Sequence, residues 1–260
     1  MTAPLRIDGL GVGYGARRVI DRLSLPPIEG GGVTALIGPN AAGKTTLLRA
    51  LAGLLPASGS VRLGDVELTR LGHAEHALHV TYMPQALPQR VSLTVIEATL
   101  SALMSAPAGR AASEAPPRLR VMRTLDRLGI ADLALRGLDE LSGGQRQLAS
   151  LAQSIVREPE VLLLDEPTSA LDLRHQMQVM QLVAELARER GIIVVVVLHD
   201  IALASRWSRR LVVLAGGELA ADGPPEEAVT PEMLARVYGV EARVERCSRG
   251  FVQVMVDRAL

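Results

Sequence analysis

Residues 38–46 read GPNAAGKTT and contain Lys44, the only lysine in a chain whose lysines and arginines together number 28. The spacing G-x-x-x-x-G-K-[ST] predicts a loop that cradles phosphates, because glycines let backbone N–H groups turn toward an anion and the following helix adds partial positive charge. A slender lysine stem can lie along this loop and place its charge on the β- and γ-phosphates, where a planar guanidinium would be too wide. We therefore predict a nucleotide site, with the Thr45 hydroxyl directed to Mg²⁺; the alternative is a glycine-rich turn with an incidental lysine. The predicted contacts are Gly38, Pro39, Asn40, Ala41, Ala42, Gly43, Lys44, Thr45 and Thr46.

An acidic pair, Asp165 and Glu166, follows the aliphatic run at 161–164 in VLLLDEPTSALD. An aspartate at the end of such a strand helps to hold Mg²⁺ beside nucleotide phosphates. The adjacent Glu166 is placed to orient and polarise an attacking water, since phosphoryl transfer depends on positioning and charge stabilisation. The alternative is an acidic turn after a strand.

The stretch LSGGQ, residues 141–145, precedes a segment with apolar residues at helical spacing. Ser142 and Gln145 fit a capping box, which is a purely structural explanation. Gly143 and Gly144 also permit close approach of a helix N-terminus to an anion, so a second phosphate contact is the functional reading. The apolar stripe consists of Leu148, Leu151, Ala152 and Ile155.

The elements that must position these residues alternate between short aliphatic runs, at 33–37, 161–164 and 192–198, and longer segments of helical spacing. This alternation predicts an α/β protein whose parallel strands are buried on both faces. A crossover helix that ends at Gly191 is expected before the last run. Its apolar stripe is Val179, Leu182, Val183 and Leu186.

Other segments depart from this alternation. Residues 61–69 and 211–223 predict β-hairpins, because Gly-Asp and Gly-Gly separate short apolar runs. The middle of the chain is predicted to be helical, with a mobile loop at 105–118. We predict a core with a β subdomain at 1–90 and 159–225, an inserted helical subdomain at 91–158, and a C-terminal extension at 226–260 with a helix at 231–238.

Composition limits the classes of function. The 260 residues are 48% hydrophobic and only 2% aromatic, which predicts a sizeable core of Leu, Val, Ile and Ala. The 28 acidic residues balance the 28 basic ones, so no net positive field would attract nucleic acid or anionic lipid. No apolar run approaches the roughly 20 residues of a membrane span, and no signal peptide is expected. The single cysteine, Cys247, favours a reducing compartment.

The order of these motifs resembles that of the nucleotide-binding subunit of an ABC transporter. It runs GPNAAGKT, then Gln85 in YMPQ, LSGGQ, VLLLDEP, SALD, and His199 in LHD. The resemblance spans most of the chain. It implies an ATPase with a P-loop NTPase core, an antiparallel β subdomain and an inserted helical subdomain. It also implies a head-to-tail dimer, in which each ATP with its Mg²⁺ lies between the phosphate loop of one copy and LSGGQ of the other.

The resemblance implies further roles at matching positions. Gln85 would contact Mg²⁺ and the attacking water, and His199 would contact the γ-phosphate; the alternatives are a polar loop residue and a structural histidine. Asp172 belongs to the segment expected to cross the dimer interface. Tyr14 would stack on adenine or, in the alternative reading, merely pack. Ala41 departs from the family's usual glycine, and alanine costs energy if φ there is positive, but we expect binding to survive.

Two weaker signals bear on the type of transporter. The tail at 224–244 and the segment LHDIALA resemble the ATPase subunits of importers for iron-siderophores, haem or cobalamin. The resemblance places a permease's coupling helix against residues 87–104, although the usual Gly-Arg-x-Pro is lacking there. It therefore implies permease partners, an indirect link to a substrate-binding protein, and a place on the cytoplasmic face of the cell membrane.

Within the family, the alternative is the ATPase subunit of another ABC importer or of an exporter. Functions other than transport fit the sequence less well. A DNA-repair or chromosome-structuring ATPase needs a coiled-coil arm or zinc module, and a regulatory or translation-associated protein normally carries two cassettes. We therefore expect no nucleic-acid partner. His73, His76 and His79 suggest a metal site, but a surface helix is the favoured reading. The remaining expectations are structural: Arg209 and Arg210 face solvent, and Cys247 is a small buried side chain.

Overall fold

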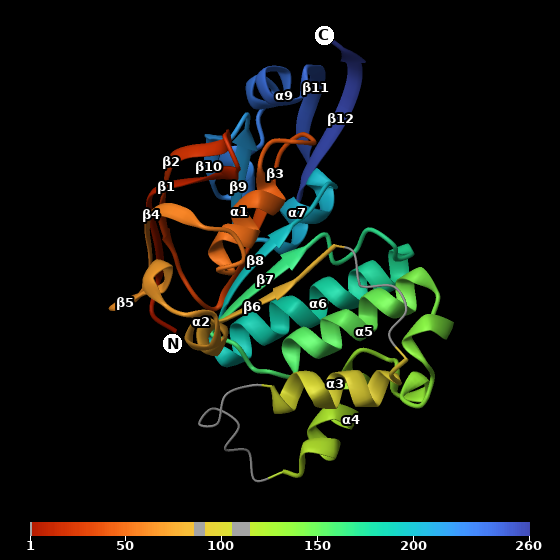
Figure 1. The fold of residues 1–260 in the computed structure, drawn as a ribbon. Coiled ribbons are helices and arrows are strands. Elements are labelled where there is room, and N and C mark those ends of the chain that lie inside the picture. Colours follow the sequence, from red (N-terminus) through yellow and green to blue (C-terminus); the bar gives the residue numbers. More distant parts are fainter. Residues whose placement is uncertain (1, 86–91, 106–114) are drawn as a thin grey trace.

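The computed structural model describes residues 2–85, 92–105 and 115–260. Within them, the central sheet has the strand order β10-β9-β3-β8-β7-β6 (Figure 1). Strands β6, β7, β8, β3 and β9 are mutually parallel and β10 is antiparallel to β9. Every residue of β7 and β8 is buried. The parallel pairings confirm the predicted parallel sheet, and the antiparallel pairing of β9 with β10 confirms the hairpin predicted at 211–223. The strands are β3 Gly32–Ile37, β6 Val80–Met83, β7 Val161–Asp165, β8 Ile193–Val197, β9 Arg210–Ala215 and β10 Glu218–Gly223.

Three helices follow strands of this sheet. α1 (Lys44–Leu51) follows β3, α6 (Leu173–Arg190) crosses from β7 to β8, and α7 (Ile201–Trp207) leads from β8 to β9. Gly191 ends α6 in the left-handed conformation, with φ 63°, as predicted. Pro56 is the residue that the sequence offers as the end of α1, but the helix stops earlier, at Leu51, because the chain turns through Gly53, whose φ is +68°.

An antiparallel sheet of order β2-β1-β4-β5 covers α1. Leu63 of β4 pairs with Val66 of β5, which confirms the first predicted hairpin. The inner face of the antiparallel sheet belongs to the same apolar cluster as Leu47 and Leu48 of α1 and Val195 of β8. The elements of this region are β1 Leu5–Tyr14, β2 Arg17–Ile28, β4 Ala57–Leu63, β5 Val66–Glu67, the short 3₁₀ helix η1 Leu68–Arg70 and α2 His73–His79.

In the middle of the chain, the described residues form helices joined by turns, with an isolated β-bridge between Thr94 and Gly137. α3, α4 and α5 pack together beside the edge of the central sheet at β6 (Figure 1). Most of the loop predicted at 105–118 lies outside the described residues. Its last two residues, Pro117 and Arg118, are already in α4, because proline suits the first helical position. The elements are α3 Val95–Met104, α4 Pro117–Arg127, η2 Ala131–Leu133, η3 Leu138–Glu140 and α5 Gly143–Ile155.

The C-terminal residues add α8 (Pro225–Ala228), α9 (Pro231–Tyr238) and a hairpin of β11 (Val240–Arg246) and β12 (Val252–Ala259). The helix matches the range predicted for it. α9 packs on β11 and α7 packs on β12, so the tail is attached to the central sheet. The division into three regions by residue number stays a prediction.

Among the described residues, the buried hydrophobic side chains are all Leu, Val, Ile, Ala or Met, as the low aromatic content predicts. None of the described helices is both long and apolar enough to span a membrane.

Three structural predictions for single residues need correction. Arg210 does not face solvent: its guanidinium is mostly buried and pairs with Asp222 at 2.6 Å, because β9 and β10 bring the two together. Cys247 is half-exposed, since it lies in the turn between β11 and β12. His76 is only 5% exposed and lies against Gly53, so α2 is not wholly a surface helix. The described residues contain no group of three His, Cys, Asp or Glu placed to hold a metal ion.

Candidate active site

The loop between β3 and α1 has the backbone that an anion site requires. Gly38 has φ 145°, and a Cβ there would come within 2.1 Å of the Leu214 carbonyl oxygen. Ala41 has φ 63°, so the condition under which alanine is unfavourable there is met. Gly43 begins α1 with φ 100° and provides no side-chain cap. The first N–H groups of the helix are therefore free of a capping side chain and available to phosphate oxygens.

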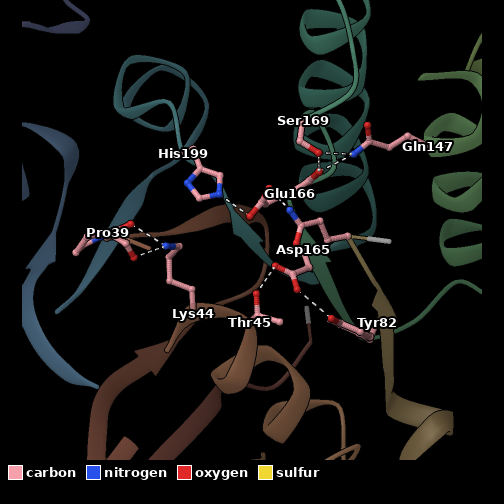
Figure 2. Close-up of polar contacts among 11 residues, drawn as sticks. Pro39, Lys44, Thr45, Tyr82, Gln147, Asp165, Glu166, Ser169 and His199 are labelled. Atoms are coloured by element: carbon pink, nitrogen blue, oxygen red, sulfur yellow. Dashed lines mark hydrogen bonds and ion pairs between the residues drawn. The ribbon is translucent and has the colours of Figure 1, made fainter. Parts of the chain in front are cut away.

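The side chain of Lys44, the only lysine in the chain, lies along this loop. Its Nζ donates to the carbonyl oxygens of Gly38, at 2.7 Å, and Pro39, at 2.8 Å (Figure 2). The residue is only 6% exposed, and this burial lowers the pKa of the ammonium, while Glu166 and Asp165 oppose the shift. A compact cation is therefore held over the loop, facing two carboxylates.

Asp165 ends β7 and is completely buried. Its carboxylate accepts hydrogen bonds from the Thr45 hydroxyl at 3.1 Å and from the Tyr82 hydroxyl at 3.0 Å. Burial raises the pKa of Asp165, and these two bonds oppose the increase. Burial likewise raises the pKa of Tyr82 to about 12, so its phenol remains a hydrogen-bond donor at neutral pH.

Glu166 is the next residue and has a left-handed backbone, with φ 52°. Gln85 donates from Nε2 to one carboxylate oxygen at 2.6 Å, and His199 Nε2 lies 2.5 Å from the other. His199 comes from the end of β8 and Gln85 from the end of β6, because parallel strands release their carboxyl ends at one edge of the sheet. Three predicted site residues therefore meet in one polar cluster.

A cavity of about 380 Å³ unites most of the predicted residues. Its walls include Tyr14, which is 45% exposed, residues 40–46 of the loop, Glu166 and His199. The Tyr14 hydroxyl accepts a 3.4 Å bond from Arg49, and a hydrogen bond with Thr46 is the main cause that lowers its pKa. The lining residues are Tyr14, Arg17, Val19, Asn40, Ala41, Ala42, Gly43, Lys44, Thr45, Thr46, Glu166 and His199.

The LSGGQ residues and Asp172 lie outside this cavity. Ser142 and Gln145 form the predicted capping box at the start of α5, where Gly143 and Gly144 are its first two residues. Asp172 caps α6, accepting from the backbone N–H of His175 at 2.9 Å, and its side chain is 66% exposed. The capping-box explanation of Ser142 and Gln145 is therefore correct, and Ser142, Gly143 and Asp172 remain exposed to solvent.

Three polar residues of the site were missed by the sequence analysis: Arg17, which lines the cavity, Tyr82 and Gln147. The Tyr82 hydroxyl donates to the Asp165 carboxylate, and Gln147 donates to the backbone carbonyl of Glu166 at 2.5 Å. Gln147 precedes Leu151 by one helical turn, so it lies on the buried side of α5. The signal in the sequence that could have revealed Gln147 is a polar side chain on the same face of the helix as the apolar stripe.

Residues 22–169 match the family model for ABC transporters. The phosphonates import ATP-binding protein PhnC 1 of Rhodopseudomonas palustris (strain HaA2) is 41% identical over 91% of this chain and 87% of its own length. The chain belongs to the ABC transporter family. It is an ATP-binding subunit, and therefore an ATPase.

Other relatives of this ABC ATPase have names that refer to iron compounds. The hemin import ATP-binding protein HmuV of Rhodococcus jostii (strain RHA1) is 41% identical, over 90% of this chain and 80% of its own. The ferric enterobactin transport ATP-binding protein FepC of Escherichia coli (strain K12) is 36% identical, over 93% and 89%. The predicted family, fold class and enzymatic activity are thereby confirmed.

Solved structures agree with this assignment. An inward-facing metal-chelate type ABC transporter matches with a TM-score of 0.81 and 25% identity, over 99% of this ABC ATPase and 98% of that chain. A dimeric ATP-binding cassette in a post-hydrolysis state, bound to ADP and Pi, matches with a TM-score of 0.76 and 26% identity, over 85% and 98%.

The donor set at the end of β7 suits Mg²⁺. The Thr45 hydroxyl and the Asp165 carboxylate are hard oxygen donors 3.1 Å apart, and the Gln85 side chain reaches Glu166 beside them. Such oxygens, completed by phosphate oxygens and water, are what Mg²⁺ prefers. The residues present therefore fit this ion.

Proposed function

We propose that this chain powers the import of a metal chelate of the iron-siderophore, haem or cobalamin type. The observation that carries the proposal is the match to the metal-chelate type transporter, which covers 99% of this chain and therefore includes α9, β11 and β12. The hemin and ferric enterobactin relatives support the same class of cargo.

In the proposed site the phosphate loop and the α1 N-terminus bind the ATP phosphates, Lys44 contacts the β- and γ-phosphates, and Tyr14 stacks on adenine. Thr45, Asp165 and Gln85 would hold Mg²⁺, which when bound neutralises charge on the phosphates. Tyr82 supports this arrangement by donating to Asp165 on the side opposite Thr45.

The proposed catalytic step rests on Glu166. Its carboxylate orients and polarises the attacking water, because positioning and charge stabilisation dominate phosphoryl transfer. Gln85 and His199 hold the two carboxylate oxygens of Glu166, which fixes the direction of its side chain. In the ATP-bound state His199 would contact the γ-phosphate.

ATP binding would close a head-to-tail dimer, and hydrolysis would reopen it. The second copy would present Ser142, Gly143, Gly144 and Gln145 to the γ-phosphate, with Asp172 at the interface. The exposure of Ser142 and Asp172 and their position outside the cavity support this role, since a contact across an interface needs both. The dimeric cassette bound to ADP and Pi is similar to this chain.

The energy of closure would pass to a permease, which holds the subunit on the cytoplasmic face of the membrane and receives cargo from a substrate-binding protein. The permease contact is proposed for residues 87–104, of which the structure describes 92–104. Within this range, α3 begins with a complete capping box between Thr94 and Glu97, which stabilises the N-terminus of the helix.

Phosphonate import is a second candidate, because the phosphonates import protein PhnC 1 is as similar to this chain as the hemin protein is. The test is uptake by liposomes that contain this subunit with the permease that co-purifies with it. We expect ATP-dependent uptake of a ferric siderophore, haem or cobalamin and none of a phosphonate. Uptake of the phosphonate alone would overturn the choice of cargo and leave the ATPase assignment intact.

A further inference from the structure

Gln147 joins the helix that carries LSGGQ to the backbone of Glu166. It is only 6% exposed and comes from the first turns of α5. Its Nε2 donates to the Glu166 carbonyl oxygen at 2.5 Å, and its Oε1 accepts from the backbone N–H of Ala170 at 3.0 Å. Figure 2 shows this amide beside Glu166 and Ser169. One side chain therefore contacts both ends of the turn that follows the catalytic carboxylate.

The backbone of Glu166 needs such support. Its φ of 52° lies in the left-handed region, which a residue with a Cβ adopts only when its surroundings hold it there. Ser169 also donates to the Glu166 carbonyl, from Oγ at 3.2 Å and from its backbone N–H at 3.3 Å. The direction of the Glu166 side chain therefore depends on how this carbonyl is held.

The same segment is packed tightly against the start of α5. A Cβ at Gly144 would lie 3.1 Å from the Ala170 carbonyl oxygen and 3.2 Å from Leu171 Cδ2. On the other side, Gln176 of α6 donates to the carbonyls of Thr168 and Leu171 at 3.2 and 3.1 Å. Because little free space separates α5 from this segment, a displacement of α5 must also displace the segment.

We propose that Gln147 is a positioning residue that couples engagement of LSGGQ to the placement of Glu166 in the same subunit. The inference rests on the proposed function, in which LSGGQ contacts the ATP of the second copy while Glu166 acts on the ATP of its own phosphate loop. Gln147 then links the two half-sites of one chain. Hydrolysis at one site is favoured only when the α5 N-terminus has closed on the other nucleotide.

Two substitutions separate this role from simple packing. Gln147→Glu keeps the shape and the acceptor for Ala170 but loses the donor to Glu166, and Gln147→Leu removes both bonds while filling the buried space. We expect kcat for ATP to fall at least about tenfold in each, with the KM for ATP changed less than about threefold, because binding groups are untouched. We also expect the Hill coefficient for ATP to fall toward one.

The matched control is Gln176→Leu, which loosens the same segment from α6 without touching α5 or Glu166. It should retain the parent Hill coefficient. A second measurement uses a Glu166→Gln background, where Gln147→Glu should still form the ATP-bound dimer, whereas a folding defect would abolish it. If Gln147→Leu fails to fold, Gln147→Glu decides the matter.

The outcomes separate the two proposals. Gln147 variants with parent kcat and parent Hill coefficient would overturn the coupling role, provided that Glu166→Gln is inactive. A variant that loses dimer formation in the Glu166→Gln background has a structural defect, which also contradicts the positioning role. If Glu166→Gln itself hydrolyses ATP at the parent rate, the proposed function of Glu166 fails first.

Discussion

The surroundings of Lys44 constrain the identity of this residue. Both carbonyls that its ammonium contacts belong to the loop itself, so the charge is held within a narrow space beside Asp165 and Glu166. A guanidinium has the same charge but a planar fork that cannot take this path.

Lys44→Arg should therefore weaken ATP binding at least about tenfold, a loss of about 1.4 kcal/mol, despite the unchanged charge. Titration calorimetry with ATP checks this. Arg17→Lys is the matched control, because Arg17 lines the same cavity and the change again exchanges the two cations. Equal affinity of the Lys44→Arg variant and the parent protein would refute our account of the lone lysine.

Ala41 occupies a left-handed position, which costs a residue with a Cβ on the order of 1 kcal/mol. Ala41→Gly relieves this strain but loosens the unfolded chain, so we expect ATP affinity to rise by less than about tenfold. Ala42→Gly is the control, since Ala42 has no positive φ. A parent protein that binds ATP only after Ala41→Gly would contradict the expectation that the loop functions with alanine.

At the scale of elements, α2 contains a histidine that makes stability depend on pH. Burial lowers the pKa of His76 from its ordinary value of 6.5, and the neighbouring His79 and His73 lower it further. The folded protein thus keeps His76 neutral below pH 6.5, while the unfolded chain takes up a proton. The stability that the folded protein has above pH 6.5 is therefore lost progressively as the pH falls below that value, because protonation of His76 favours the unfolded chain.

His76→Phe should reduce the loss of unfolding free energy between pH 8 and pH 5, by up to about 1.4 kcal/mol for each pH unit below the unfolded pKa. Urea denaturation at the two values measures it. His73→Phe changes an exposed ring on the same helix and should alter the pH dependence much less, because burial is the largest cause of the His76 shift and His73 a smaller one. The same pH dependence in the His76 variant and the parent would show that the pKa of His76 is the same in the folded and unfolded states, which would contradict the prediction.

At the scale of the whole molecule, the LSGGQ residues lie outside the cavity. Under the proposed function, one chain therefore holds two incomplete half-sites. Glu166→Gln should bind ATP with parent affinity, abolish turnover, and accumulate as an ATP-bound dimer. Analytical ultracentrifugation with Mg-ATP and a phosphate-release assay check both results. Glu189→Gln, on the exposed side of α6, should behave like the parent.

A Glu166→Gln subunit that remains a monomer with ATP would contradict the head-to-tail arrangement, whereas one that hydrolyses ATP would contradict the role of the carboxylate. The first result would leave the assignment of the phosphate loop intact. The second would direct attention to the other polar groups of the cluster.

The sequence by itself determined the parallel sheet, the phosphate loop and the family, because these depend on local pattern: aliphatic runs for β3, β7 and β8, and fixed spacing around Lys44. The hairpins and the helix at 231–238 were predictable for the same reason. Local pattern failed where long-range contacts decide. Arg210 was expected in solvent but is paired with Asp222 of the next strand.

Only the tertiary structure decided which polar groups surround Glu166. Tyr82 and Gln147 are 84 and 19 residues from Glu166 along the chain, and nothing in their immediate neighbours shows that one supports Asp165 and the other holds the Glu166 carbonyl. The left-handed backbone of Glu166 was equally hidden, because φ at that turn depends on bonds from α5. Sequence pattern names the groups that do chemistry, and packing selects the groups that hold them in place.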